Sequence, residues 1–175
     1  MCKIIGIDIS KQTFDVGFND GSNWHHLVLD NNEKGFKRLL KVLSNNDWVV
    51  MEASGPYYLK LATFFYGKGY NVCVLNPLII KRYSQTRLIR AKTDKKDAQI
   101  IAEYGAQYRL KQWKPEPTNI SKIKQLYTVL ELLNKEVHQS ERQLEALTAT
   151  GVMDKDLKSI LQGIVSYLTC KRNKV

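Results

Sequence analysis

Two aspartates three residues apart, Asp94 and Asp97, stand in a segment otherwise rich in lysine and arginine. On a helix that spacing places both carboxylates on one face, about one turn apart. The surrounding cations, our candidate nucleic-acid-binding residues, are Lys81, Arg82, Arg87, Arg90, Lys92, Lys95 and Lys96. Carboxylates can hold a metal ion while neighbouring cations hold a polyanion. The alternative is an ordinary exposed helix start, because aspartate is favoured in the first turn.

Two distant acids stand where short apolar segments end. Asp8 lies near the end of the β-branched segment 3–9, and Glu52 follows the apolar segment 48–51. If these segments are neighbouring parallel strands, their carboxyl ends meet at one edge of a sheet. The helix that carries the aspartate pair can reach the same edge. Taken alone, each acid has an ordinary explanation, as a hydrogen-bond acceptor at a strand end or an acid at a helix start.

Four carboxylates in a small volume repel one another, which raises their pKa values or drives them apart. Hard divalent cations remove this repulsion, and Mg²⁺ prefers carboxylate, water and phosphate oxygens. Two such ions about 4 Å apart can activate an attacking oxygen and stabilise a leaving oxygen in phosphodiester chemistry. We therefore predict that Asp8, Glu52, Asp94 and Asp97 are catalytic residues and ligands of Mg²⁺ or Mn²⁺.

The other acids and the histidines have no comparable placement. We interpret as surface or local structural acids Asp15, Asp20, Asp30, Asp47 and Glu103. His25 and His26 are adjacent in a strand-like segment and point to opposite faces, so they cannot easily share a metal. Ordinary surface or core roles are predicted for both, and for His138.

The segments that would position the acids follow an α/β order. Strands are predicted at 3–9, 13–19, 24–30, 48–52 and 70–75. One helix is expected to open at Asn31-Asn32 and end at Asn45-Asn46, a second to run from Pro56 to about Tyr66, and a third to start after Thr93 as N-cap. We predict a three-layer α/β fold with a mixed sheet whose first three strands form an antiparallel meander.

The segment 114–117, Lys-Pro-Glu-Pro, is typical of a linker. It predicts a first domain at 1–113 and a helical region at 118–175. Within that region apolar residues recur every seven positions over four heptads, with one polar exception at Ser140. Two interpretations stay open, a helical hairpin packed on the first domain and a coiled coil that joins two or more copies of the chain.

Composition limits the partners. The 175 residues carry a formal net charge of +10, which favours DNA, RNA or an anionic membrane surface. No apolar segment reaches the roughly 18 residues of a membrane-spanning helix. The first residues lack the apolar stretch of a secretory signal, so we expect a cytoplasmic protein. Three widely separated cysteines indicate neither a disulfide framework nor a zinc site.

Four motifs together resemble those of a known family, the DEDD-type transposases of insertion sequence 110. They are Gly6-Ile7-Asp8-Ile9-Ser10-Lys11 with Phe14-Asp15-Val16, then Met51-Glu52-Ala53-Ser54-Gly55-Pro56-Tyr57, Val74-Leu75-Asn76-Pro77, and Ala91-Lys92-Thr93-Asp94-Lys95-Lys96-Asp97-Ala98. The resemblance covers roughly the first 110 residues of the chain.

This resemblance implies a RuvC-like catalytic domain of the RNase H superfamily, with Mg²⁺ on Asp8, Glu52, Asp94 and Asp97. It also implies DNA strand cleavage and exchange in transposition, guided by a structured RNA. A coiled coil after that domain is a family feature that matches 118–148.

One departure from the family pattern bears on activity. Family members carry a further carboxyl-terminal domain with a serine thought to attack DNA, and this sequence ends at Val175 without it. We expect an isolated domain, a truncated element or half of a split protein, and do not assign the serine's role to Ser54 or Ser140. The alternative function is a module that binds nucleic acid and dimerises but is inactive without that domain. A third candidate, the phosphate loop of the actin and sugar-kinase superfamily, would need a second such domain.

Overall fold

The computed structural model describes residues 2–87 and 93–175, so Arg90 and Lys92 lie outside the described residues. The chain divides into two compact units, Met1–Pro115 and Glu116–Val175, which we call the sheet unit and the helical unit. Each is described by itself.

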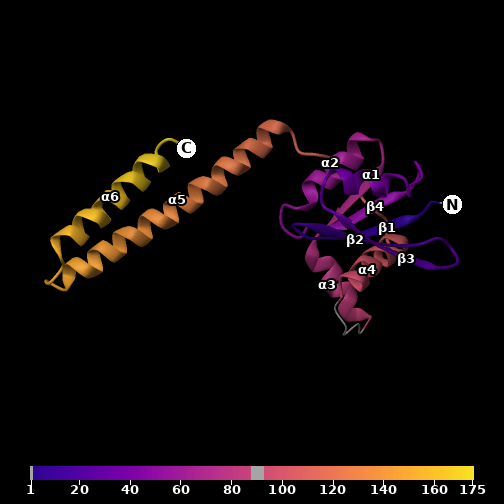
Figure 1. The fold of residues 1–175 in the computed structure, drawn as a ribbon, viewed down its shortest axis with the longest axis horizontal. Helices are drawn as coiled ribbons and strands as arrows, with labels where there is room; N and C mark the ends of the chain where they lie inside the picture. The colour runs from indigo at the N-terminus through magenta and orange to yellow at the C-terminus, as the bar shows by residue number, and fades with distance from the viewer. Residues whose placement is uncertain (1, 88–92) are drawn as a thin grey trace. The chain divides into compact units, whose positions relative to one another are not determined.

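The sheet unit contains one five-stranded mixed sheet (Figure 1). Its strands are β1 (Ile4–Ile9), β2 (Thr13–Asn19), β3 (Trp24–Asp30), β4 (Trp48–Glu52) and β5 (Asn71–Leu75), in the spatial order β3-β2-β1-β4-β5. The first three strands are antiparallel neighbours, and β4 and β5 continue the sheet in parallel from β1. The predicted α/β fold with an antiparallel meander is confirmed.

Two helices, α1 (Glu33–Leu40) and α2 (Tyr58–Gly67), cover one face of the sheet (Figure 1). The core on this face includes Ile5, Ile7, Phe14, Leu39, Leu61 and Phe65. Helix α1 opens at the predicted Asn31-Asn32, and Asn32 is its N-cap because its side chain accepts from the amides of Lys34 and Gly35. Such a cap stabilises a helix by about 1 kcal/mol.

The predicted ends of these helices were partly wrong. Helix α1 ends at Leu40 rather than at Asn45-Asn46. Beyond it the fully buried carboxylate of Asp47 accepts from the amides of Lys3 and Ser44, which fixes a turn instead of another helical turn. Helix α2 starts at Tyr58, so the predicted start at Pro56 was two residues early.

The opposite face of the sheet carries α4 (Asp94–Gln107), with α3 (Pro77–Thr86) packed beside it (Figure 1). Helix α4 lies so close to β1 that a Cβ added to Gly6 would stand 2.1 Å from the carbonyl oxygen of Ala98. Helix α3 had not been predicted, although Asn76 as N-cap and Pro77 in the first turn are ordinary helix-start residues.

The helical unit consists of α5 (Thr118–Ala149) and α6 (Lys155–Arg172), which pack against each other. Gly151, with φ +72°, stands in the turn between them. Val137 and Leu161 are buried in this hairpin, whereas the heptad residues Ile123 and Leu126 near the start of α5 are exposed. Within the described part of the chain, every helix is too short or too polar to cross a membrane.

Candidate active site

Strands β1 and β4 bring Asp8 and Glu52 to the same edge of the sheet. The two strands are parallel neighbours with Ile7 paired to Met51, so the two acids are the next residues along each strand. Alternation along a strand places Asp8 on the face of Gly6 and Glu52 on the face of Val50. Gly6 faces α4, and Val50 packs with residues of α3 and α4, so both lie on the same face of the sheet. The two carboxylates therefore share one face as well as one edge.

Helix α4 begins at the same edge and supplies the aspartate pair. Thr93 is its N-cap as predicted, with a side-chain oxygen that accepts from the amide of Lys96. Asp94 is exposed and Asp97 is half-buried, while Ala98 is completely buried against the sheet. Because α4 packs tightly against Gly6, this contact determines the distance between the first turn of the helix and Asp8.

All four predicted acids line one open cleft of about 1130 Å³. The rest of the lining comes from the loop after β4, from α3 with its N-cap residue, and from α4: Ser54, Asn76, Pro77, Leu78, Ile80, Lys81, Ser84, Gln85 and Ile100. Ser54 orients Glu52, because its hydroxyl donates a 2.6 Å hydrogen bond to Oε1 of that carboxylate. The structure thus brings together acids that are far apart in the sequence, although their roles as metal ligands stay a prediction.

The electrostatics of the cleft are those of crowded acids. Burial, followed by the charges of Asp97, Glu52, Asp94 and Asp15, raises the pKa of Asp8 from 3.8 to about 6. Each of these influences disfavours the ionised carboxylate. A cation placed among the acids would reverse that effect, so the site favours a positively charged ligand.

The donor set fits a hard divalent cation because it consists of carboxylate oxygens with hydroxyl and amide oxygens beside them. Across residues 2–87 and 93–175, however, no three His, Cys, Asp or Glu side chains form a group that could hold a metal ion as they stand. The four acids line one cleft without closing on a single point.

Of the predicted cations that the structure describes, one lies at the cleft. Lys81 on α3 lines it, whereas Arg87 pairs with Glu103 at 2.8 Å and lies over the ring of Tyr83. The exposed side chains Arg82, Lys95 and Lys96 belong to α3 and α4 but do not line the cleft.

Asp15 lies closer to the cleft than a surface or local structural acid would. It pairs directly with Asp8 across β1 and β2, and it adds to the charges that raise the Asp8 pKa. The short link between β1 and β2 could have indicated this pairing from the sequence, because the length of the link sets the register of the two strands.

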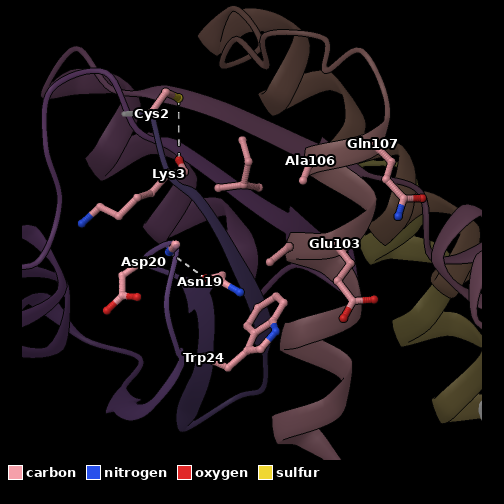
Figure 2. A pocket seen from close by; sticks show the side chains of 11 residues that line it. Cys2, Lys3, Asn19, Asp20, Trp24, Glu103, Ala106 and Gln107 are labelled. Atoms are coloured by element: carbon pink, nitrogen blue, oxygen red, sulfur yellow. Dashed lines mark hydrogen bonds between the residues drawn. The ribbon is translucent and has the colours of Figure 1, made fainter.

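A second cavity lies at the other end of α4, and Figure 2 shows it. Its volume is about 360 Å³, and its lining includes Ile4, Trp24, Ala102 and Ala106. None of the four predicted acids lines it.

Comparison with known proteins gives the family. Residues 5–151 match the model of a transposase family, the DEDD type of insertion sequence 110. This chain belongs to that transposase family. The predicted resemblance is therefore confirmed.

The chain is also similar to curated proteins described as pilin gene-inverting proteins, from Moraxella bovis and Moraxella lacunata. Each is 33% identical over 150 residues, which are 82% of this chain and 47% of the relative. The chain thus spans about half the length of these relatives.

Solved structures of RuvC from Thermus thermophilus are similar as well. The structure in complex with a Holliday junction substrate has a TM-score of 0.45 and 16% identity, and the match covers 61% of this chain and 93% of that one. A second RuvC structure has a TM-score of 0.38 and 15% identity, with 66% and 84% covered.

Proposed function

We propose that this chain is the metal-dependent catalytic part of a transposase that cleaves and exchanges DNA strands when an insertion sequence moves. The observation that carries the proposal is the convergence of Asp8, Glu52, Asp94 and Asp97, from two strands and a helix, on one cleft. Membership in the transposase family supports the reaction class.

Each acid has a definable role in this proposal. Asp8, Glu52, Asp94 and Asp97 would hold Mg²⁺ or Mn²⁺, which when bound would activate an oxygen nucleophile and stabilise the leaving oxygen of a phosphodiester. A bound cation would favour the ionised form of Asp8, whose pKa is raised to about 6 by burial and the neighbouring acids. Ser54 keeps Glu52 turned in one direction by its hydrogen bond.

The proposed partners are DNA and a structured guide RNA, the latter by resemblance to the family. The net charge of +10 and the position of Lys81 on the cleft wall suit a phosphate backbone. The Moraxella relatives are described as inverting a pilin gene, which supports the proposal that this chain acts in a DNA rearrangement. Exposed Ile123 and Leu126 on α5 support our proposal that the helical unit joins two or more copies of the chain.

A second candidate function is a nucleic-acid-binding and dimerisation module that needs further protein to become catalytic. The net charge of +10 and the exposed apolar residues Ile123 and Leu126 of α5 favour it, because nucleic-acid binding and association through these features need no bound metal.

End-labelled duplex and four-way-junction DNA, incubated with the protein and Mn²⁺, distinguishes the two functions. We expect strand cleavage that disappears with EDTA and in Glu52→Gln. The matched control Glu33→Gln should cleave like the wild type, because Glu33 is an exposed acid of α1 on the opposite face of the sheet. Cleavage that survives EDTA would contradict the proposal. Salt-sensitive DNA binding without cleavage under any metal would favour the second function.

A further inference from the structure

A carboxylate–imidazole pair lies beside the cleft, on the strands of the meander. Oδ1 of Asp15 on β2 and Nε2 of His26 on β3 are 2.6 Å apart. The side chains are 13% and 25% exposed, so the pair is shielded from solvent more than an ordinary surface ion pair.

The register of the sheet places this pair next to Asp8. Asp15 is the direct cross-strand partner of Asp8, and His26 is the partner of Gly17. Directly opposed residues of antiparallel strands share a face, with Cβ atoms about 5 Å apart. A Cβ on Gly17 would stand 2.9 Å from the amide of Gln99, so this face is the one that α4 covers.

Two carboxylates in directly opposed positions repel each other. Something must hold Asp15 in place, and the short contact with His26 does so. With Asp15 held on the β3 side, repulsion directs the Asp8 carboxylate away from it, toward Glu52 and the cleft.

We propose that Asp15 and His26 are positioning residues of the cleft: His26 holds Asp15 across from Asp8, and Asp15 orients Asp8 and adds a negative charge behind the cation site. The inference rests on the proposed function, since it assigns these residues to the cation site described there. Neither residue lines the cleft, so neither is assigned as a ligand.

The same hairpin contains a matched control. His25 and Asp20 form an equivalent pair, with Nε2 and Oδ2 2.5 Å apart, but its side chains are 44% and 40% exposed. Asp20 stands in the turn between β2 and β3 and lines the cavity of Figure 2 rather than the cleft. The His25–Asp20 pair therefore has the same chemical groups as the His26–Asp15 pair but does not lie next to Asp8.

Calorimetric titration with MnCl₂ tests the proposal on the whole chain. Asp15→Asn and His26→Ala should each weaken Mn²⁺ binding about tenfold, as is typical of outer-sphere partners of metal ligands. His26→Gln should restore binding to within about threefold of the wild type, because its amide can still donate to Asp15. Asp20→Asn and His25→Ala should bind like the wild type.

Several results would overturn the inference. Unchanged affinity in Asp15→Asn would do so, as would undetectable binding, which would make Asp15 a ligand. His26→Gln as weak as His26→Ala would also count against it. A wild type that binds no Mn²⁺ would overturn the proposed function and this inference with it, whereas a binding wild type with unaffected variants would overturn the inference alone.

A measurement on the wild type avoids any effect of mutation on folding. During a Mg²⁺ titration, the ring ¹⁵N resonances of His26 should shift with the same midpoint as the calorimetric binding, and those of His25 should not. Equal shifts at both histidines, or none at either, would contradict the assignment.

Discussion

The two ends of helix α4 face two different cavities. At its first turn lies the cleft of the four acids, and at its last turns lies the smaller cavity with Trp24 (Figure 2). Strand β1 also contributes to both, with Asp8 at one end and Ile4 at the other.

An aspartate stands at each of these cavities, and their pKa values shift in opposite directions. Hydrogen bonds from the amides of Asn23 and Ser22, together with His25, hold the pKa of Asp20 below its usual value. Burial and neighbouring acids raise that of Asp8 to about 6. The β2–β3 turn supplies hydrogen-bond donors to the carboxylate of Asp20. The carboxylate of Asp8, at the ends of two parallel strands, stands among other negative charges. Only the second arrangement favours a cation.

The largest expected effect is on cation binding. Asp8→Asn should abolish measurable Mn²⁺ binding, because it removes a charge at the centre of the acid group. Asp20→Asn, the same substitution at the other cavity, should bind as the wild type does. Calorimetry, or electron paramagnetic resonance of free Mn²⁺, measures the Mn²⁺ affinity of both variants. A similar loss of Mn²⁺ affinity in the two variants would contradict the proposed difference between the cavities.

The next effect concerns the helix that links the cavities. Gly6→Ala should lower the free energy of unfolding by about 3 kcal/mol, because its Cβ would stand 2.4 Å from the amide of Ala102 as well as close to Ala98. Gly67→Ala, whose Cβ meets nothing within 4 Å, should change stability by less than about 1 kcal/mol. Urea denaturation measures both. A Gly6→Ala variant as stable as the wild type would contradict the close contact of α4 with β1.

The third effect is on the pH dependence of stability without divalent metal. The folded pKa of Asp8 lies above its usual 3.8, so the folded state binds the proton more tightly. The stabilisation is therefore complete below about pH 4 and is lost as pH rises through about 6. With allowance for solvent screening the loss is about 1–2 kcal/mol.

Urea denaturation in EDTA between pH 4 and 7 can measure this loss as the difference between the wild type and Asp8→Asn. Asp20→Asn should leave the pH dependence between pH 4 and 7 essentially unchanged, because the stability that the lowered pKa of Asp20 adds is lost only as pH falls below its usual value of 3.8. Parallel curves for the wild type and Asp8→Asn would show that Asp8 is not in a crowded acidic site.

The smallest effect is expected at the second cavity. Trp24 is 41% exposed, so Trp24→Ala should lower stability by only about 1 kcal/mol. Mn²⁺ affinity should stay within about twofold of the wild type, since the cavities lie at opposite ends of α4. A large loss of Mn²⁺ binding would indicate that the two ends are coupled through the helix.

Much of the fold followed from local patterns. Alternating and β-branched segments located all five strands, Asn31-Asn32 was correctly predicted to open α1, and Thr93 was correctly predicted as the N-cap of α4. Helix α3 was missed because its first residues, Asn76-Pro77, also fit a turn, and its exposed cations obscured the apolar pair Ile80 and Tyr83. The end of α1 was missed because the buried carboxylate of Asp47, which accepts from distant Lys3, acts only in the folded chain.

Three features can be read from the amino-acid sequence: which residues carry charge, where the acids stand relative to strand ends, and the motifs that indicate the transposase family. These depend on residue type and spacing alone. The folded arrangement was needed to learn that Lys81 lines the cleft while Arg87 pairs with Glu103, and that Asp15 opposes Asp8. Strand register and helix packing bring distant residues within a few ångströms, and electrostatic forces act on those distances rather than on separation along the chain.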